Sequence, residues 1–161
     1  MGLPQEALSA KASGILAAAA SLLSSLEAGK NLDARILREA MLSAFRASDA
    51  DGAWIWKDAY EAAEAAAVLF LRKYAKAMRA KAATPANYLA MIERLSALLP
   101  SHTRRSEESD QFQQFSTPLG LAYLMGHAAQ IARGEAVLEP SAGAGLLAIQ
   151  AEAAGAGDGL K

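Results

Sequence analysis

The sequence predicts a mainly α-helical protein, in which an N-terminal helical bundle precedes a single β–α unit of an open α/β sheet. Apolar residues recur at helical spacing through residues 1–100, and no alternating run of β-branched residues occurs before residue 136. The short apolar run 136–138 then ends at Glu139 and leads into a glycine-rich turn. Helix is therefore expected nearly everywhere, with one strand close to the end of the chain.

Four helices are expected in the first part of the chain. The first has an apolar segment, 15–23, that is too short to span a bilayer and is interpreted as helix core, so no membrane association is expected. In the third, alanines along one side would let another helix approach closely. A basic stripe on that helix, Arg72, Lys76 and Arg79, is interpreted as a solvated face. The expected helices cover residues 4–28, 32–47, 54–82 and 85–99.

Composition excludes several kinds of site. The formal net charge is −1, so no overall field favours nucleic acid. The absence of cysteine excludes a disulfide framework, a thiolate metal site and a cysteine nucleophile, and it agrees with the cytoplasmic location that we expect. The two histidines, His102 and His127, are too isolated in the sequence to indicate a metal site.

Two short segments carry most of the functional information. The first, 114–118, reads Gln-Phe-Ser-Thr-Pro and precedes a helix expected over 119–132, which Thr117 could cap with Pro118 at its first position. The second, 137–145, reads Val-Leu-Glu-Pro-Ser-Ala-Gly-Ala-Gly and precedes a helix expected to begin at Leu146. A strand, a glycine-rich turn and a helix in this order present backbone N–H groups to a nucleotide-like cofactor.

Together these motifs resemble the opening of an S-adenosylmethionine-dependent N6-adenine DNA methyltransferase. The stretch 103–149 is similar to a narrower group, the large bacterial and phage methylase–helicase proteins of the strawberry notch type, and the similarity extends back over 58–74. The resemblance implies a helical region at 1–100, a linker at 101–110 and the start of a Rossmann-like methyltransferase domain at 111–161. It also implies DNA, the rest of the methyltransferase polypeptide and a helicase as partners of the full-length relative.

The resemblance further implies which residues contact S-adenosylmethionine. Phe115 could stack on the adenine or pack on the following helix, and Glu139 could attract the methionine ammonium or orient the glycine-rich turn by accepting backbone N–H bonds. The polar stretch 101–110 could be a solvated linker or a segment that folds over the cofactor or DNA. The expected cofactor contacts are Gln114, Phe115, Thr117, Pro118, Glu139, Pro140, Ser141, Ala142, Gly143 and Gly145.

The chain also departs from the family pattern. Ala144 stands where the relatives usually have threonine, and Asp158 comes too early to be the acid that holds the cofactor ribose. The relatives use an Asn/Asp-Pro-Pro-aromatic loop to hold a flipped adenine, whereas no two of the five prolines here are adjacent. We therefore expect the N-terminal piece of a larger methylase, without a catalytic residue, inactive alone and binding the cofactor weakly.

Two alternatives of other kinds stay open. The chain could be a non-enzymatic helical interaction module whose glycine-rich turn is vestigial, or a truncated reading frame without an independent role.

Overall fold

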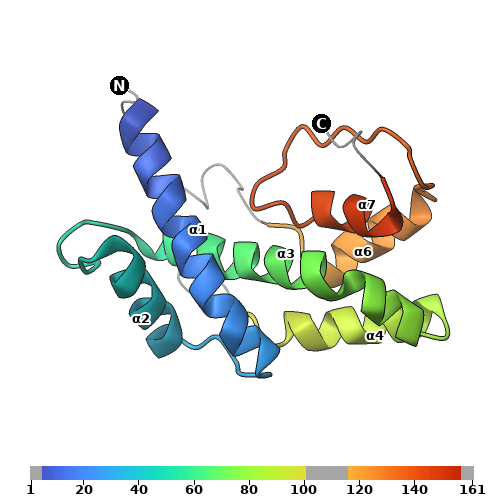
Figure 1. Ribbon diagram of the computed structural model, residues 1–161, viewed down its shortest axis with the longest axis horizontal. Helices are drawn as coiled ribbons and strands as arrows, with labels where there is room; N and C mark the ends of the chain where they lie inside the picture. The colour runs from blue at the N-terminus through green and yellow to red at the C-terminus, as the bar shows by residue number, and fades with distance from the viewer. Residues whose placement is uncertain (1–4, 101–115, 157–161) are drawn as a thin grey trace.

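The computed structural model describes residues 5–100 and 116–156, and within these ranges the chain is mainly α-helical (Figure 1). The predicted helical class is therefore confirmed. The linker expected at 101–110 lies outside the described residues, so the proposed domain boundaries stay predictions. The described helices are α1 (Gln5–Glu27), α2 (Ala34–Phe45), α3 (Trp56–Lys81), α4 (Pro85–Ser96), α6 (Leu119–Ala128) and α7 (Ala148–Ala154).

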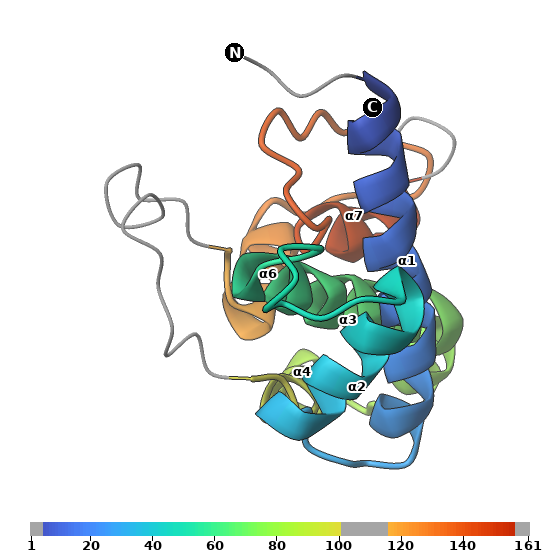
Figure 2. The same cartoon turned by 90° about the vertical axis from the view of Figure 1, so that its left-hand side faces the viewer.

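Helix α3 is the centre of the arrangement. In Figures 1 and 2 it lies between α4 and α7, and α1 crosses it near its N-terminal half. Five alanines in that half are buried, which confirms the close helix approach that the small side chains predict. They are Ala59, Ala62, Ala63, Ala66 and Ala67.

Helices α2 and α4 are capped at their N-termini, and α1 makes a close contact with α2. The side chain of Asp33 accepts a hydrogen bond from the Ile36 N–H at 2.8 Å and caps α2. Thr84 caps α4 in the same way, with Pro85 at the first helical position. Where α1 passes α2, a Cβ on Gly14 would lie 2.6 Å from the Phe45 ring, so glycine lets the ring pack directly against α1 in this position.

The strand expected at 136–138 is not formed. No strand occurs within 5–100 and 116–156; Val137 makes an isolated bridge, and the side chain of Leu138 is 76% exposed. A strand is stabilised by the neighbouring strands with which it pairs, and the part of the chain that the structure describes offers no such neighbour. The predicted strand is therefore not found, and the described ranges provide no sheet that 136–138 could join.

The last two helices are shorter than expected. Helix α6 ends at Ala128 instead of near residue 132, and α7 begins at Ala148, after a turn at Leu146 and Leu147. Both helices pack on the bundle, α6 against α4 and α7 against α3. No helix in the described ranges has the length and apolar character needed to cross a membrane.

Candidate cofactor-binding site

The segment 139–145 forms a closed turn whose own groups hold it in place. A carboxylate oxygen of Glu139 accepts a hydrogen bond from the Ser141 N–H at 2.8 Å. Farther along, the Gly145 N–H donates to the Ala142 carbonyl at 2.7 Å. Glu139 therefore has the orienting role that was one of its two predicted functions.

Both glycines of the turn adopt the left-handed backbone region, with φ of +50° at Gly143 and +92° at Gly145. Residues with a Cβ rarely take this conformation, so the backbone itself selects glycine at both positions. Crowding by neighbouring atoms does not select glycine at these positions. A Cβ added to Gly143 would lie 3.9 Å from the Ser141 carbonyl oxygen, and one added to Gly145 would lie 3.9 Å from Val68 Cγ2. The turn thus has a defined backbone conformation, and no atom lies closer than 3.9 Å to the place of a side chain at either glycine.

The turn leads directly into α7. The Gly145 carbonyl accepts the Ile149 N–H at 2.9 Å, one residue after α7 begins at Ala148. Leu146 and Ile149 are buried, so the apolar side of this segment faces the core while the turn faces outward. Of the predicted contacts in the turn, Pro140, Ser141 and Ala142 are exposed together with Gly143.

The first motif is anchored by a residue that the sequence analysis did not single out. The Ser116 hydroxyl donates to a carboxylate oxygen of Glu64 on α3 at 2.7 Å, and Glu64 is only 5% exposed. Helix α6 is capped one residue later than expected, at Pro118, whose carbonyl accepts the Ala122 N–H at 2.8 Å. Thr117 is half-buried and does not cap the helix.

The two remaining predicted contacts of this motif, Gln114 and Phe115, lie outside the described residues. Whether Phe115 stacks on a base or packs on α6 therefore stays open.

Both motifs meet on one face of α3. Ser116 is hydrogen-bonded to Glu64, and Gly145 lies beside Val68, four residues farther along α3. Residues at i and i+4 are neighbours on a helix surface. The structure therefore places the two segments, which are about one helix apart in the sequence, against neighbouring residues of α3.

The α3 face beside Ser116 is acidic. Burial raises the pKa of the Glu61 carboxyl, an effect that the charges of Asp58 and Glu64 reinforce and that Lys57 and Lys11 oppose. Asp58 itself is 2% exposed and forms an ion pair with Lys11 of α1 at 2.9 Å. The region therefore carries negative charge next to the first motif.

The predicted basic stripe on α3 does not behave as one solvated face. Arg72 is paired with Glu152 of α7 at 2.8 Å, whereas the guanidinium of Arg79 lies over the rings of Tyr88 and Tyr123. Arg79 and Gln150 line a cavity between α3, α6 and α7 that the sequence analysis missed. The available signal was a glutamine within the short, largely apolar helix of α7.

No protein-family model, no curated protein and no solved structure matches this chain. The resemblance carried by the two motifs therefore stays a prediction.

Proposed function

We propose that this chain is the N-terminal portion of an S-adenosylmethionine-dependent DNA adenine-N6 methyltransferase-like protein, with part of the cofactor site and without the catalytic motif. The observation that carries the proposal is the turn 139–145. Two left-handed glycines, an acid that holds the turn and a following helix are the features by which an open α/β domain accepts a nucleotide-like cofactor.

The residues that are present fit the methionine half of the cofactor. The turn exposes main-chain groups at Gly143, and the Glu139 carboxylate has two oxygens that together accept about four hydrogen bonds. One carboxylate can therefore orient the turn and also attract the methionine ammonium, so its two predicted roles are compatible. When bound, the cofactor supplies the methyl group; this chain contributes binding and orientation.

The exposed apolar residues of α6 and Leu138 support a larger domain. Leu121, Leu124 and Met125 of α6 are each about half exposed, and Leu138 is more exposed still. Helices that are apolar on all sides are usually buried, and exposed apolar side chains gathered together mark a contact surface. In the proposed full-length protein, the later strands of the methyltransferase sheet pair with 136–138 and cover these side chains.

The proposal places the protein in the cytoplasm, with DNA as substrate of the full-length protein and a helicase as a further partner. These assignments rest on the motif resemblance.

A second candidate function is a helical interaction module with a vestigial turn. The same exposed side chains of α6 favour it, because they would equally serve a protein partner. The two functions differ in what they expect of the cofactor: an interaction module has no use for S-adenosylmethionine at any chain length.

Calorimetric titration with S-adenosylmethionine tests the proposal on two proteins, the 161-residue chain and the chain extended along its natural reading frame. Each hydrogen bond missing from the ribose and adenine forfeits about 0.5–1.5 kcal/mol, so we expect millimolar or undetectable binding by the short chain and roughly micromolar binding by the extended one. Absence of binding by the extended chain would contradict the proposal and favour the interaction module.

A matched pair of variants distinguishes a specific effect of the turn on cofactor binding from a general loss of folding. In the extended chain, Gly145→Val forces a β-branched residue into the left-handed region within the turn, and we expect binding to be lost. Gly52→Val makes the same change at a glycine with φ of +71° in the loop before α3, where nothing lies within 4 Å of the new Cβ. Binding of S-adenosylmethionine should survive this control. An equal loss of binding in both variants would show that the turn is not part of the cofactor site.

A further inference from the structure

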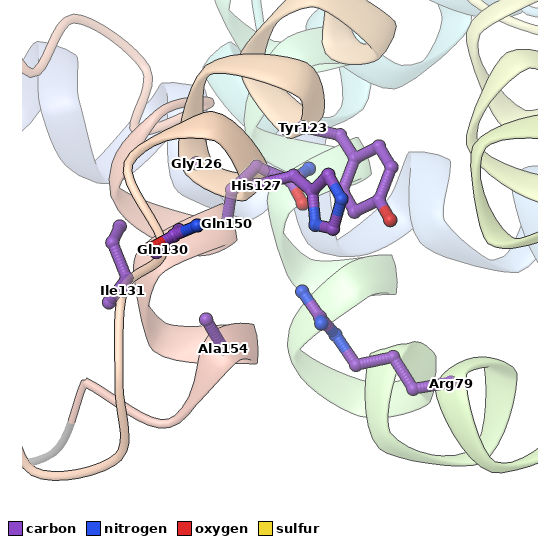
Figure 3. A pocket seen from close by; sticks show the side chains of 8 residues that line it. All are labelled: Arg79, Tyr123, Gly126, His127, Gln130, Ile131, Gln150 and Ala154. Carbon is purple, nitrogen blue, oxygen red and sulfur yellow. The ribbon is translucent and has the colours of Figure 1, made fainter. Parts of the chain in front are cut away.

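The cavity between α3, α6 and α7 is lined by residues outside the glycine-rich turn. Its volume is about 120 Å³. Figure 3 shows the Arg79 guanidinium directed from α3 toward the side chains of Tyr123 and His127 on α6, while Gln150 and Ala154 line the cavity from α7. The Tyr123 and His127 rings are stacked, with centroids 5.8 Å apart, and both residues line the cavity.

Gln150 is the most unusual residue of this cavity. It is 2% exposed, and neither its side-chain nitrogen nor its side-chain oxygen has a hydrogen-bond partner among the described residues. Gln150 packs beside Gly126 of α6, where an added Cβ would make an ordinary van der Waals contact, 3.5 Å from the Gln150 Cβ. A buried amide without partners is costly, so this side chain calls for a ligand that offers both an acceptor and a donor.

Arg79 supplies a positive charge at the same cavity. Its Nε is buried and has no hydrogen-bond partner in the described part of the chain. The guanidinium is held by the Tyr88 ring, 4.7 Å from its centroid, and by the Tyr123 ring at 6.0 Å. No aspartate or glutamate is among the residues that line the cavity. The charge therefore faces the cavity without a carboxylate to balance it there.

These groups define the chemistry of a ligand. Arg79 and the Gln150 nitrogen need an oxyanion as acceptor, and a guanidinium matches a carboxylate in shape and charge. The Gln150 oxygen needs a donor, which a hydroxyl provides; an ammonium would be repelled by Arg79 and would find no acid in the wall. A cavity of 150 Å³ holds benzene, which has six non-hydrogen atoms, so this smaller one takes about five.

We propose that the cavity binds a small hydroxycarboxylate, with its carboxylate on Arg79 and its hydroxyl on the amide of Gln150. This site does not depend on the proposed methyltransferase function, because it uses neither the glycine-rich turn nor the first motif.

The test is a titration of the isotope-labelled full chain, followed through the NMR signals of the Gln150 side-chain amide and the Arg79 Nε–H. Glycolate is the probe, and acetate, glycolamide, glycine and inorganic phosphate are its matched comparisons. We expect saturable shifts of both signals with glycolate, with a dissociation constant on the order of 1 mM, well inside the limit for so small a ligand. Acetate lacks the hydroxyl and glycolamide the charge, so each should bind at least about tenfold more weakly.

Two variants address the two polar groups separately. Gln150→Leu removes both unpartnered atoms and should keep or raise the melting temperature, while glycolate binding falls about ten- to a hundredfold. Arg79→Met keeps the packing stem, removes the charge and should cause a loss of similar size. Lys76→Met is the control, because it removes one positive charge from an exposed position of the same helix; binding should change less than about twofold.

Three results would overturn the proposal. One is the absence of saturable shifts with glycolate, which would mean that the cavity holds water only. Another is phosphate or glycine binding as tightly as glycolate, because the site would then not select a hydroxycarboxylate. The third is glycolate binding that persists in Gln150→Leu and Arg79→Met, since the ligand would then lie elsewhere.

Discussion

Helices α1 to α4 and the segment 116–156 are stabilised in different ways. The first region buries large side chains such as Trp54, Leu22 and Met41 in a shared core, and its helices α2 and α4 carry side-chain caps. The exposed large apolar side chains of the first region are spread over α1, α2 and the residue before α3, whereas the second region gathers three of them, Leu121, Leu124 and Met125, on the short helix α6. Neither α6 nor α7 has a side-chain cap. Both regions share one core, to which the second contributes Leu119, Tyr123 and Ile149. The comparison indicates that α6 and α7 are positioned by their packing on α4 and α3 and not by side-chain caps of their own.

The largest expected effect is a deletion in the bundle core. Leu22→Ala should lower the free energy of unfolding by about 2–5 kcal/mol, because it leaves a cavity among buried helices. Leu138→Ala removes the same atoms from an exposed position of the second region and should change it by less than about 0.5 kcal/mol. Urea denaturation measures both; equal losses would contradict the difference between the regions.

The next largest effect concerns the start of α3. Asp58 is buried, accepts the Ile55 N–H at 2.9 Å and pairs with Lys11, so Asp58→Ala should cost about 2–3 kcal/mol. Asp33→Ala removes a cap from the exposed start of α2 and should cost about 1 kcal/mol. Thermal unfolding distinguishes the two variants. A smaller loss of stability in Asp58→Ala than in Asp33→Ala would show that the buried contacts of Asp58 do not stabilise the protein more than an exposed cap does.

A moderate effect on association is expected from the surface of α6. Because Leu121, Leu124 and Met125 expose apolar surface on one helix, we expect the chain to self-associate weakly through α6. The double variant Leu121→Lys and Leu124→Lys should reduce this association while changing the free energy of unfolding by about 1 kcal/mol or less. Leu42→Lys is the matched control, a single half-exposed leucine on α2 of the bundle. Sedimentation velocity would contradict the assignment if Leu42→Lys reduced association to the same degree.

The smallest expected effect is one of pH. Because burial raises the pKa of Glu61 in the folded protein, its contribution to stability is fully present below the unfolded pKa and is lost as the pH rises through the folded pKa. Glu61→Gln should therefore be more stable than the parent at pH 7 and equal to it near pH 3. Urea midpoints at the two pH values check this, and an equal difference at both would contradict it.

Local sequence signals predicted the bundle well. Thr84 and Pro85 begin α4 where the sequence indicates, and the buried alanines of α3 follow the predicted small-residue side. The glycine-rich turn and the Glu139 contact were also foreseeable, since Glu139 and Ser141 are only two residues apart. Local chemistry decides these features, so the sequence alone reveals them.

Features that depend on distant partners were not predictable in this way. The run 136–138 has strand character but no neighbouring strand in the described structure. Arg79 was expected in solvent, yet Tyr88 and Tyr123 from two other helices hold it at a cavity. Ser116 and Glu64 are 52 residues apart, and nothing in either local sequence indicates their contact.

The position of both motifs on α3 makes the cofactor segments dependent on helical register. An α-helix rises 1.5 Å and turns 100° per residue, so the spacing between Glu64 and Val68 fixes the separation and relative direction of Ser116 and Gly145. One residue inserted between 64 and 68 would rotate one anchoring point by about 100° relative to the other. Helix α3, which belongs to neither motif, thus sets the distance between them.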